Sequence, residues 1–261
     1  MKLFDLNKPV IAMIHIDALP GTPKYSGGVV KIIEKALAEA STYQECGIEA
    51  LSIENMHDVP YLNRVVGAEI TSIMSIILYE IKKKFNLPTG IQILAGANKD
   101  ALAAAHSAGA DFIRAEGFVF AHVADEGTFN SDAGELLRYK KMIGADDVLV
   151  FTDIKKKHSS HSITADTSIA ETAKAAEFFL SDGVIITGSA TGKEPSLEEI
   201  KEVKEKVNIP VLAGSGITEK NAPQYLEYCD ALIIGSHFKI DGNWANTVDP
   251  ERVKSFLSKI R

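Results

Sequence analysis

The chain has 261 residues, of which 24% are charged and 46% are hydrophobic, as in an ordinary folded protein. Lys and Arg total 28 against 35 Asp and Glu, which gives a net charge of −7. This negative charge and the lack of a basic run in the sequence argue against nucleic acid as a partner. The sequence has only two cysteines, Cys46 and Cys229, which excludes a disulfide scaffold. It has no apolar run of about 18 residues, which excludes an integral membrane segment. Because the first residues do not resemble a signal peptide, a cytoplasmic location is expected.

Eight short β-branched or apolar runs predict strands, and they alternate with stretches of helical spacing. The predicted strands are residues 10–16, 50–55, 89–95, 112–117, 148–155, 184–188, 211–216 and 231–236. The predicted helices are residues 29–45, 68–84, 99–108, 135–143, 168–180, 197–206, 219–227 and 250–260. This alternation, unbroken by any linker, predicts an α/β fold, a single-domain (β/α)8 TIM barrel over residues 1–261. A doubly wound sheet is the second choice, because no dinucleotide glycine fingerprint is present.

Long loops are concentrated at one end of the predicted barrel. Four strand-to-helix connections are long, at residues 17–28, 56–67, 118–132 and 156–166, whereas helix-to-strand connections are short. The carboxyl-terminal ends of the strands carry the active site in such barrels. We therefore expect a functional site there, with loops 17–28, 118–132 and 156–166 closing over it and the histidine-rich segment 158–161 as a polar lid.

Polar residues recur at the ends of the first five predicted strands. Residues two apart point to the same side of a strand. The polar residues that share one side of their strand in this way are His15, Asp17, Ser52, Glu54, Gln92, Arg114, Glu116, Asp153 and Lys155. Their apolar neighbours suit the helix-facing side, so the polar side chains are expected to point into the barrel. Burying charge there is costly unless the charge is paired or used. One interpretation is an internal ion pair of Arg114 with Glu54 or Glu116, and a compatible one is a catalytic site.

Five of these residues are the catalytic candidates. Glu54, Glu116 and Asp153 are candidate general acids and bases, and Arg114 and Lys155 would balance charge on the substrate. A lysine desolvated beside a carboxylate can also form a Schiff base or act as a base, which makes Lys155 a minor covalent candidate. The two lysines that follow it are expected in a solvated loop.

Three further residues are candidate substrate ligands. His15, Asn55 and Gln92 would bond substrate hydroxyls. His15 and the three candidate carboxylates could together hold a divalent metal, although no compact motif such as H-E-x-x-H supports a metal site. No other cofactor is indicated.

Three glycine- and serine-containing turns follow the last three predicted strands. The candidate phosphate ligands in these turns are Gly188, Ser189, Gly192, Gly214, Ser215, Gly216, Gly235 and Ser236. Glycines let backbone N–H groups approach an anion, and barrels of this kind often bind phosphate after strands 7 and 8. Thr218 is expected to cap the next helix. The alternative is that these glycines only permit tight turns, but three such turns favour a small phosphorylated metabolite as partner.

Several motifs resemble those of the BtpA/SgcQ family. They are the segment 9–15, Leu19-Pro20-Gly21, Ile53-Glu54-Asn55 with Pro60-Tyr61, and Ala213-Gly214-Ser215-Gly216. The resemblance covers essentially the whole chain and implies a TIM barrel of the ribulose-phosphate-binding type. Some members of that family are needed for photosystem I accumulation, and others carry sugar-metabolism and nucleosidase-like labels. The resemblance implies a fold and a phosphate site more than a substrate.

The residues predict an enzyme of the isomerase or lyase type that acts on a phosphorylated sugar or phosphoribosyl metabolite. One alternative is a nucleosidase-like hydrolase, which needs an aromatic residue stacking on the base, with Tyr25, Tyr61 and Phe120 as candidates. The other is a non-catalytic assembly factor that works through its outer surface. Such a barrel could also form a homo-oligomer.

Overall fold

Eight parallel strands form a closed barrel in the computed structural model, which describes residues 2–188 and 192–261. The strands are β3 (Val10–His15), β4 (Ala50–Glu54), β5 (Thr89–Gln92), β6 (Phe112–Ala115), β9 (Leu149–Asp153), β11 (Gly183–Thr187), β12 (Val211–Gly214) and β13 (Ala231–Ile234). They are neighbours in this order, and β13 pairs with β3 to close the ring. The predicted (β/α)8 barrel is confirmed.

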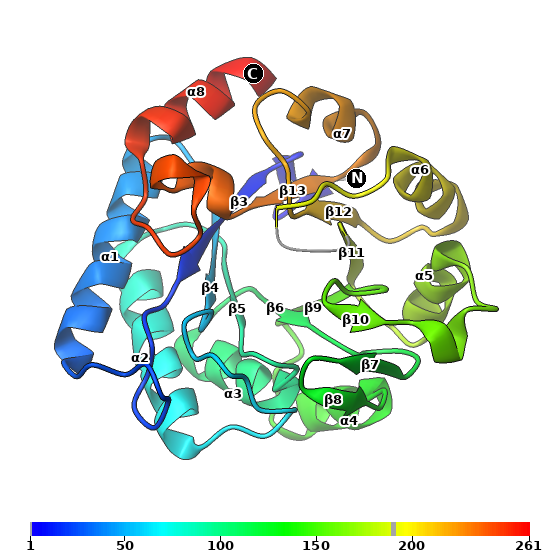
Figure 1. Cartoon of the computed structure of the whole chain (residues 1–261), viewed down its shortest axis with the longest axis horizontal. Coiled ribbons are helices and arrows are strands. Elements are labelled where there is room, and N and C mark those ends of the chain that lie inside the picture. The colour runs from blue at the N-terminus through cyan, green and yellow to red at the C-terminus, as the bar shows by residue number, and fades with distance from the viewer. Residues whose placement is uncertain (1, 189–191) are drawn as a thin grey trace.

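In the described residues, eight α-helices lie around the outside of this ring (Figure 1). They are α1 (Val29–Glu45), α2 (Ala68–Lys84), α3 (Asn98–Ala108), α4 (Ala133–Met142), α5 (Ile169–Phe178), α6 (Leu197–Lys206), α7 (Ala222–Tyr228) and α8 (Pro250–Ile260). The helix expected at residue 219 begins at Ala222 instead, so the predicted cap at Thr218 is wrong. The N-cap is Asn221, whose Oδ1 accepts from the Thr218 amide at 2.7 Å. None of the helices within the described ranges is long and apolar enough to cross a bilayer.

Side-chain alternation separates two apolar cores. On β3, Val10 and Ile14 pack in the cluster between strands and helices, whereas Ile11 and Met13 belong to a second cluster with Phe112, inside the barrel. The strands are therefore buried on both faces, as parallel strands are. The polar side chains near the carboxyl ends of the strands lie on the same side as Met13 and the other members of this second cluster. They therefore also point into the barrel.

A short amino-terminal hairpin packs against the inner apolar cluster. Its strands are β1 (Lys2–Leu3) and β2 (Leu6–Asn7), and the Phe4 ring between them lies 5.4 Å from Phe112 and 6.2 Å from Phe151. Aromatic rings at such distances pack favourably. The apolar residues thus fill the amino-terminal end of the barrel, and the polar residues lie at the other end.

Two of the long loops pair with each other in a small antiparallel sheet. Its strands are β7 (His122–Ala124), β8 (Gly127–Phe129) and β10 (Ser159–Ser160), in the order β10-β7-β8 (Figure 1). The part of the chain that the structure describes also contains three 3-10 turns, η1 (Ser162–Thr164), η2 (Ser236–Phe238) and η3 (Ile240–Gly242). The sequence does not predict this sheet, because its strands are only two or three residues long.

Candidate active site

A cavity of about 230 Å³ lies at the carboxyl-terminal ends of the strands. One part of its wall comes from the turns after β11, β12 and β13, through Gly192, Ser215, Gly216, Gly235 and Ser236. Another part comes from strand ends and the loop after β9, through His15, Glu54, Arg114 and Lys157. The three turns and the charged strand ends therefore face a common space.

Two of the expected phosphate ligands do not line this cavity. A Cβ on Gly188 would lie 2.0 Å from the carbonyl oxygen of Lys193, so this glycine is required by a close backbone approach. Gly214 ends β12, where a Cβ would lie 3.3 Å from that of Ile233. Ser189 lies outside the described residues. The turn after β11 therefore reaches the cavity through Gly192.

Two residues that the sequence analysis did not select extend the wall beside the glycine turns. Both Arg252, near the start of α8, and His237 line the cavity. The Arg252 Nε donates to the His237 carbonyl oxygen at 2.6 Å, which fixes the guanidinium beside the β13 turn. Burial, with the nearby Arg252 charge, lowers the pKa of His237. Nothing in the local sequence marks Arg252, because its position depends on how α8 packs.

His15 is held in one tautomer by a backbone contact. Its Nδ1 lies 2.9 Å from the Trp244 carbonyl oxygen, and because a carbonyl only accepts, Nδ1 carries the proton. Burial, reinforced by the Lys239 charge, lowers the pKa of His15 to about 3, so the ring is neutral at neutral pH. Nε2 is then an acceptor, and it lies 4.0 Å from the Glu54 carboxyl.

Glu54 combines a carboxyl group with a desolvated position. Burial raises its pKa, while the nearby charges of Arg114 and Lys157 act in the opposite direction. A carboxyl group whose pKa is raised holds its proton more readily than an ordinary glutamate, which suits it to proton transfer. It is the only one of the three candidate catalytic carboxyls that lines the cavity in the described part of the chain.

Arg114 and Asp153 form a buried bidentate pair. The Arg114 Nε donates to Asp153 Oδ2 at 2.8 Å, and Nη2 donates to Oδ1 at 2.9 Å. The expected partners of Arg114, Glu54 and Glu116, are therefore wrong, because Asp153 on the neighbouring β9 meets the guanidinium edge-on. Burial alone would lower the pKa of Arg114, but the Asp153 carboxylate raises it. With both oxygens engaged, Asp153 orients Arg114 and is not an open base or metal ligand.

The lysine that lines the cavity is Lys157 and not Lys155. The Lys155 backbone has a positive φ of 45°, which ends the alternation of β9, and its Nζ donates to the Thr164 carbonyl at 3.3 Å. Lys157, expected in a solvated loop, instead lines the cavity. Burial lowers its pKa, and the Arg114 charge adds to that effect.

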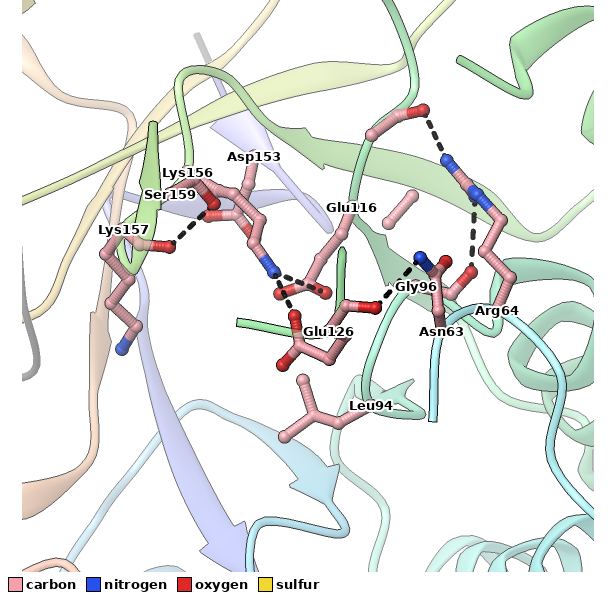
Figure 2. Close-up of polar contacts among 12 residues, drawn as sticks. Asn63, Arg64, Leu94, Gly96, Glu116, Glu126, Asp153, Lys156, Lys157 and Ser159 are labelled. Carbon is pink, nitrogen blue, oxygen red and sulfur yellow. Dashed lines mark hydrogen bonds and ion pairs between the residues drawn. The ribbon is translucent and has the colours of Figure 1, made fainter. Parts of the chain in front are cut away.

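Glu116 belongs to a separate buried cluster. The Lys156 ammonium lies 3.2 Å from Glu116 Oε2 and 3.9 Å from Glu126 Oε2 (Figure 2). It also lies 5.0 Å from the centre of the Phe129 ring. Lys156 is only 8% exposed, which contradicts its expected place in a solvated loop. Glu116 does not line the cavity and is paired with Lys156, so the geometry does not favour its expected catalytic role, which stays a prediction.

Asn55 and Gln92 do not line the cavity either. The Asn55 Nδ2 donates to Asp58 at 2.8 Å, and its Oδ1 accepts from the Leu94 amide at 2.7 Å, so both ends of the amide fasten the loop after β4. These contacts do not favour the expected contact of Asn55 with substrate, which stays a prediction. Gln92 is 1% exposed, and its Oε1 has no hydrogen-bond partner within the described residues.

Neither the metal site nor the stacking aromatics are found around the cavity. Across residues 2–188 and 192–261, no group of three or more His, Cys, Asp or Glu side chains is arranged to hold a metal ion. Of the aromatic candidates, Tyr61 donates its hydroxyl to the Met56 carbonyl at 2.7 Å, and Phe120 lines a different hollow near α4 and α5. Neither of these two, nor Tyr25, is among the described residues that line the cavity.

The model of the BtpA family matches residues 6–261. The chain belongs to this family. A Caenorhabditis elegans protein, named F13E9.13, mitochondrial, is 47% identical over 99% of this chain and 95% of its own length. The photosystem I biogenesis protein BtpA of Synechocystis is 32% identical over 97% of this chain and 88% of its own. These matches confirm the resemblance that the sequence motifs indicate.

Solved structures with the same fold differ widely in sequence. The (S)-3-O-geranylgeranylglyceryl phosphate synthase of Thermoplasma acidophilum superposes with a TM-score of 0.60 at 17% identity, covering 97% of this chain and 93% of its own. The phosphoribosylanthranilate isomerase of Pyrococcus furiosus gives 0.59 at 14% identity, covering 97% and 98%. At such identities the likeness establishes the TIM-barrel fold.

Proposed function

We propose that this BtpA-family protein is an enzyme of the isomerase or lyase type that acts on a small phosphorylated sugar or phosphoribosyl metabolite. The observation that carries the proposal is the single cavity shared by the glycine turns and by His15, Glu54 and Lys157. An anion site and proton-transfer groups in one space are what a phosphorylated substrate requires.

The glycine turns and Arg252 are suited to hold the phosphate. Gly192 has open space where a side chain would be, so an anion can approach its backbone. Ser215 and Ser236 add small hydroxyl groups, and the guanidinium of Arg252 adds positive charge. The solved structures support this part, since one of them contains its substrate sn-glycerol-1-phosphate in the same fold.

The part of the wall formed by the strand ends and the loop after β9 is suited to proton transfer on the carbon chain. The cavity of about 230 Å³ is smaller than the roughly 300–1,000 Å³ of sites for drug-sized ligands, which favours a metabolite of a few carbons. His15 Nε2 would accept a hydrogen bond from a substrate hydroxyl. Glu54 would give and take the proton, and Arg114 would stabilise negative charge on the intermediate.

Ligand-induced stabilisation tests the proposal. Ribose 5-phosphate, dihydroxyacetone phosphate and inorganic phosphate should each raise the melting temperature, since a ligand at about 100 times its Kd stabilises by about 2.7 kcal/mol. Ribose and dihydroxyacetone should not. Ser236→Asp, which places a carboxylate against the anion, should abolish the shift, and Ser258→Asp on the exposed side of α8 should keep it. No shift with any phosphorylated compound would contradict the proposal.

A non-catalytic assembly role is the second candidate, favoured by the name of the Synechocystis relative. Glu54→Gln separates the two, because it would leave an assembly phenotype intact but remove an enzyme's proton-transfer group. The proposed location is the cytoplasm, on the ground that Cys46 and Cys229 are both free thiols. Cell fractionation tests this, since the worm relative is named mitochondrial.

A further inference from the structure

Lys157 is an amine directed into the cavity without a fixed partner. Among the described residues, no hydrogen bond or ion pair engages its Nζ, although Glu54, Asp153 and Arg114 act on it electrostatically. The neighbouring Lys156 differs, because it is held by Glu116 (Figure 2). Lys157 is half-buried, and a lysine removed from solvent is normally paired, so an unpaired amine beside a carboxyl group requires an explanation.

The chain on both sides of Lys157 is fixed, which keeps the amine in place. On one side Lys156 is anchored between Glu116 and Glu126. On the other side β10 pairs with β7, where Ser159 lies opposite Ala124. Figure 2 shows Lys156 reaching toward the two glutamates while the Lys157 side chain extends in another direction. The anchored neighbours thus position Lys157, as a functional group must be positioned by rigid surroundings.

We propose that Lys157 Nζ is a nucleophile that forms a Schiff base with the carbonyl carbon of an open-chain sugar phosphate. This inference rests on the proposed function. Its burial and the Arg114 charge favour the neutral amine, which is the reactive form.

The step balances with groups on the wall of the cavity. The amine lone pair forms a C–N bond to the carbonyl carbon, and the C=O electrons pass to the oxygen, which takes one of the two nitrogen protons. A proton from Glu54 then lets that hydroxyl leave as water, which gives a protonated C=N bond and a Glu54 carboxylate. The protonated imine accepts electrons from a neighbouring C–H or C–C bond, which is the reactivity an isomerase or lyase needs.

Reductive trapping tests this assignment on the full chain. The protein is incubated with dihydroxyacetone phosphate or ribose 5-phosphate, reduced with borohydride, and examined by intact and peptide mass spectrometry. We expect one covalent adduct at Lys157, suppressed by inorganic phosphate and not formed with dihydroxyacetone or ribose. Lys157→Arg should abolish the adduct, and the matched variant Lys155→Arg, whose side chain lies toward Thr164, should retain it.

The outcomes separate this inference from the proposed function. If the sugar phosphates raise the melting temperature of the wild type but give no adduct, or give adducts spread over surface lysines, the nucleophile assignment is overturned and the phosphate site stands. If they neither bind nor react, both are overturned. The melting temperature and circular dichroism of Lys157→Arg establish that loss of the adduct does not come from unfolding.

Discussion

The buried pair of Arg114 and Asp153 should carry a large share of the stability at the mouth of the barrel. Arg114→Met removes both donors from the Asp153 carboxylate, whose side chain is only 2% exposed. Removing one partner of a buried pair costs about 3–5 kcal/mol, because the remaining charge is desolvated and unpaired. For a chain of this size, where 1 kcal/mol corresponds to about 2–4 °C, that loss lowers the melting temperature by roughly 6–20 °C.

Urea unfolding followed by circular dichroism measures this loss in Arg114→Met, in Asp153→Asn and in the double variant. The double variant should be little worse than either single one, because the second change removes a charge that is already unpaired. Lys141→Met is the matched control, since its pair with Asp146 joins side chains that are 78% and 60% exposed and should contribute about 1 kcal/mol or less. If Arg114→Met costs no more than Lys141→Met, the pair does not have the structural role described here.

Three further predictions concern the walls of the cavity. Because burial lowers the pKa of His15 from an ordinary 6.5 to about 3, the folded protein should lose stability as the pH falls through this range. Urea unfolding at several pH values should show a smaller loss for His15→Gln. The same pH dependence in this variant would contradict the burial of His15. Burial raises the pKa of Glu54, so the wild type should lose stability as the pH rises through that pKa. Glu54→Gln should therefore be the more stable protein at about pH 8, and its gain in stability should disappear toward about pH 4. A difference in stability that does not change with pH would contradict the raised pKa. Gly216→Ala places a Cβ 2.4 Å from the Lys193 carbonyl carbon and should therefore lower the melting temperature. Gly109→Ala should lower it less, because a Cβ there meets open space and only the left-handed backbone costs about 1–2 kcal/mol. Equal losses in the two variants would mean that the turn at Gly216 can move aside.

The regular part of each strand could be predicted from the sequence. Alternation along β3 and β4 correctly directs His15 and Glu54 to the inside, because Met13 and Ala50 before them belong to the inner apolar cluster. The same rule fails for Lys155, since β9 ends at Asp153 and the positive φ of Lys155 turns the chain out of the strand. Strand periodicity holds only as far as the ladder of backbone hydrogen bonds does.

The rest of the site depends on contacts between distant segments. Glycine at position 188 is required by the Lys193 carbonyl, so a glycine-rich turn alone does not identify which residues face a ligand. Glu116 is occupied by Lys156, forty positions away along the chain, and Arg252 reaches the cavity from the last helix. No local pattern in the sequence marks such partners, because they are set by how loops and helices pack on the finished barrel.

A crystal structure of the protein with ribose 5-phosphate would locate the anion site itself. We expect the phosphate group against the backbone of Gly216 and Gly235, near Arg252, with the sugar carbons toward Glu54 and Lys157. Phosphate density elsewhere on the molecule, with this cavity filled only by solvent, would contradict it.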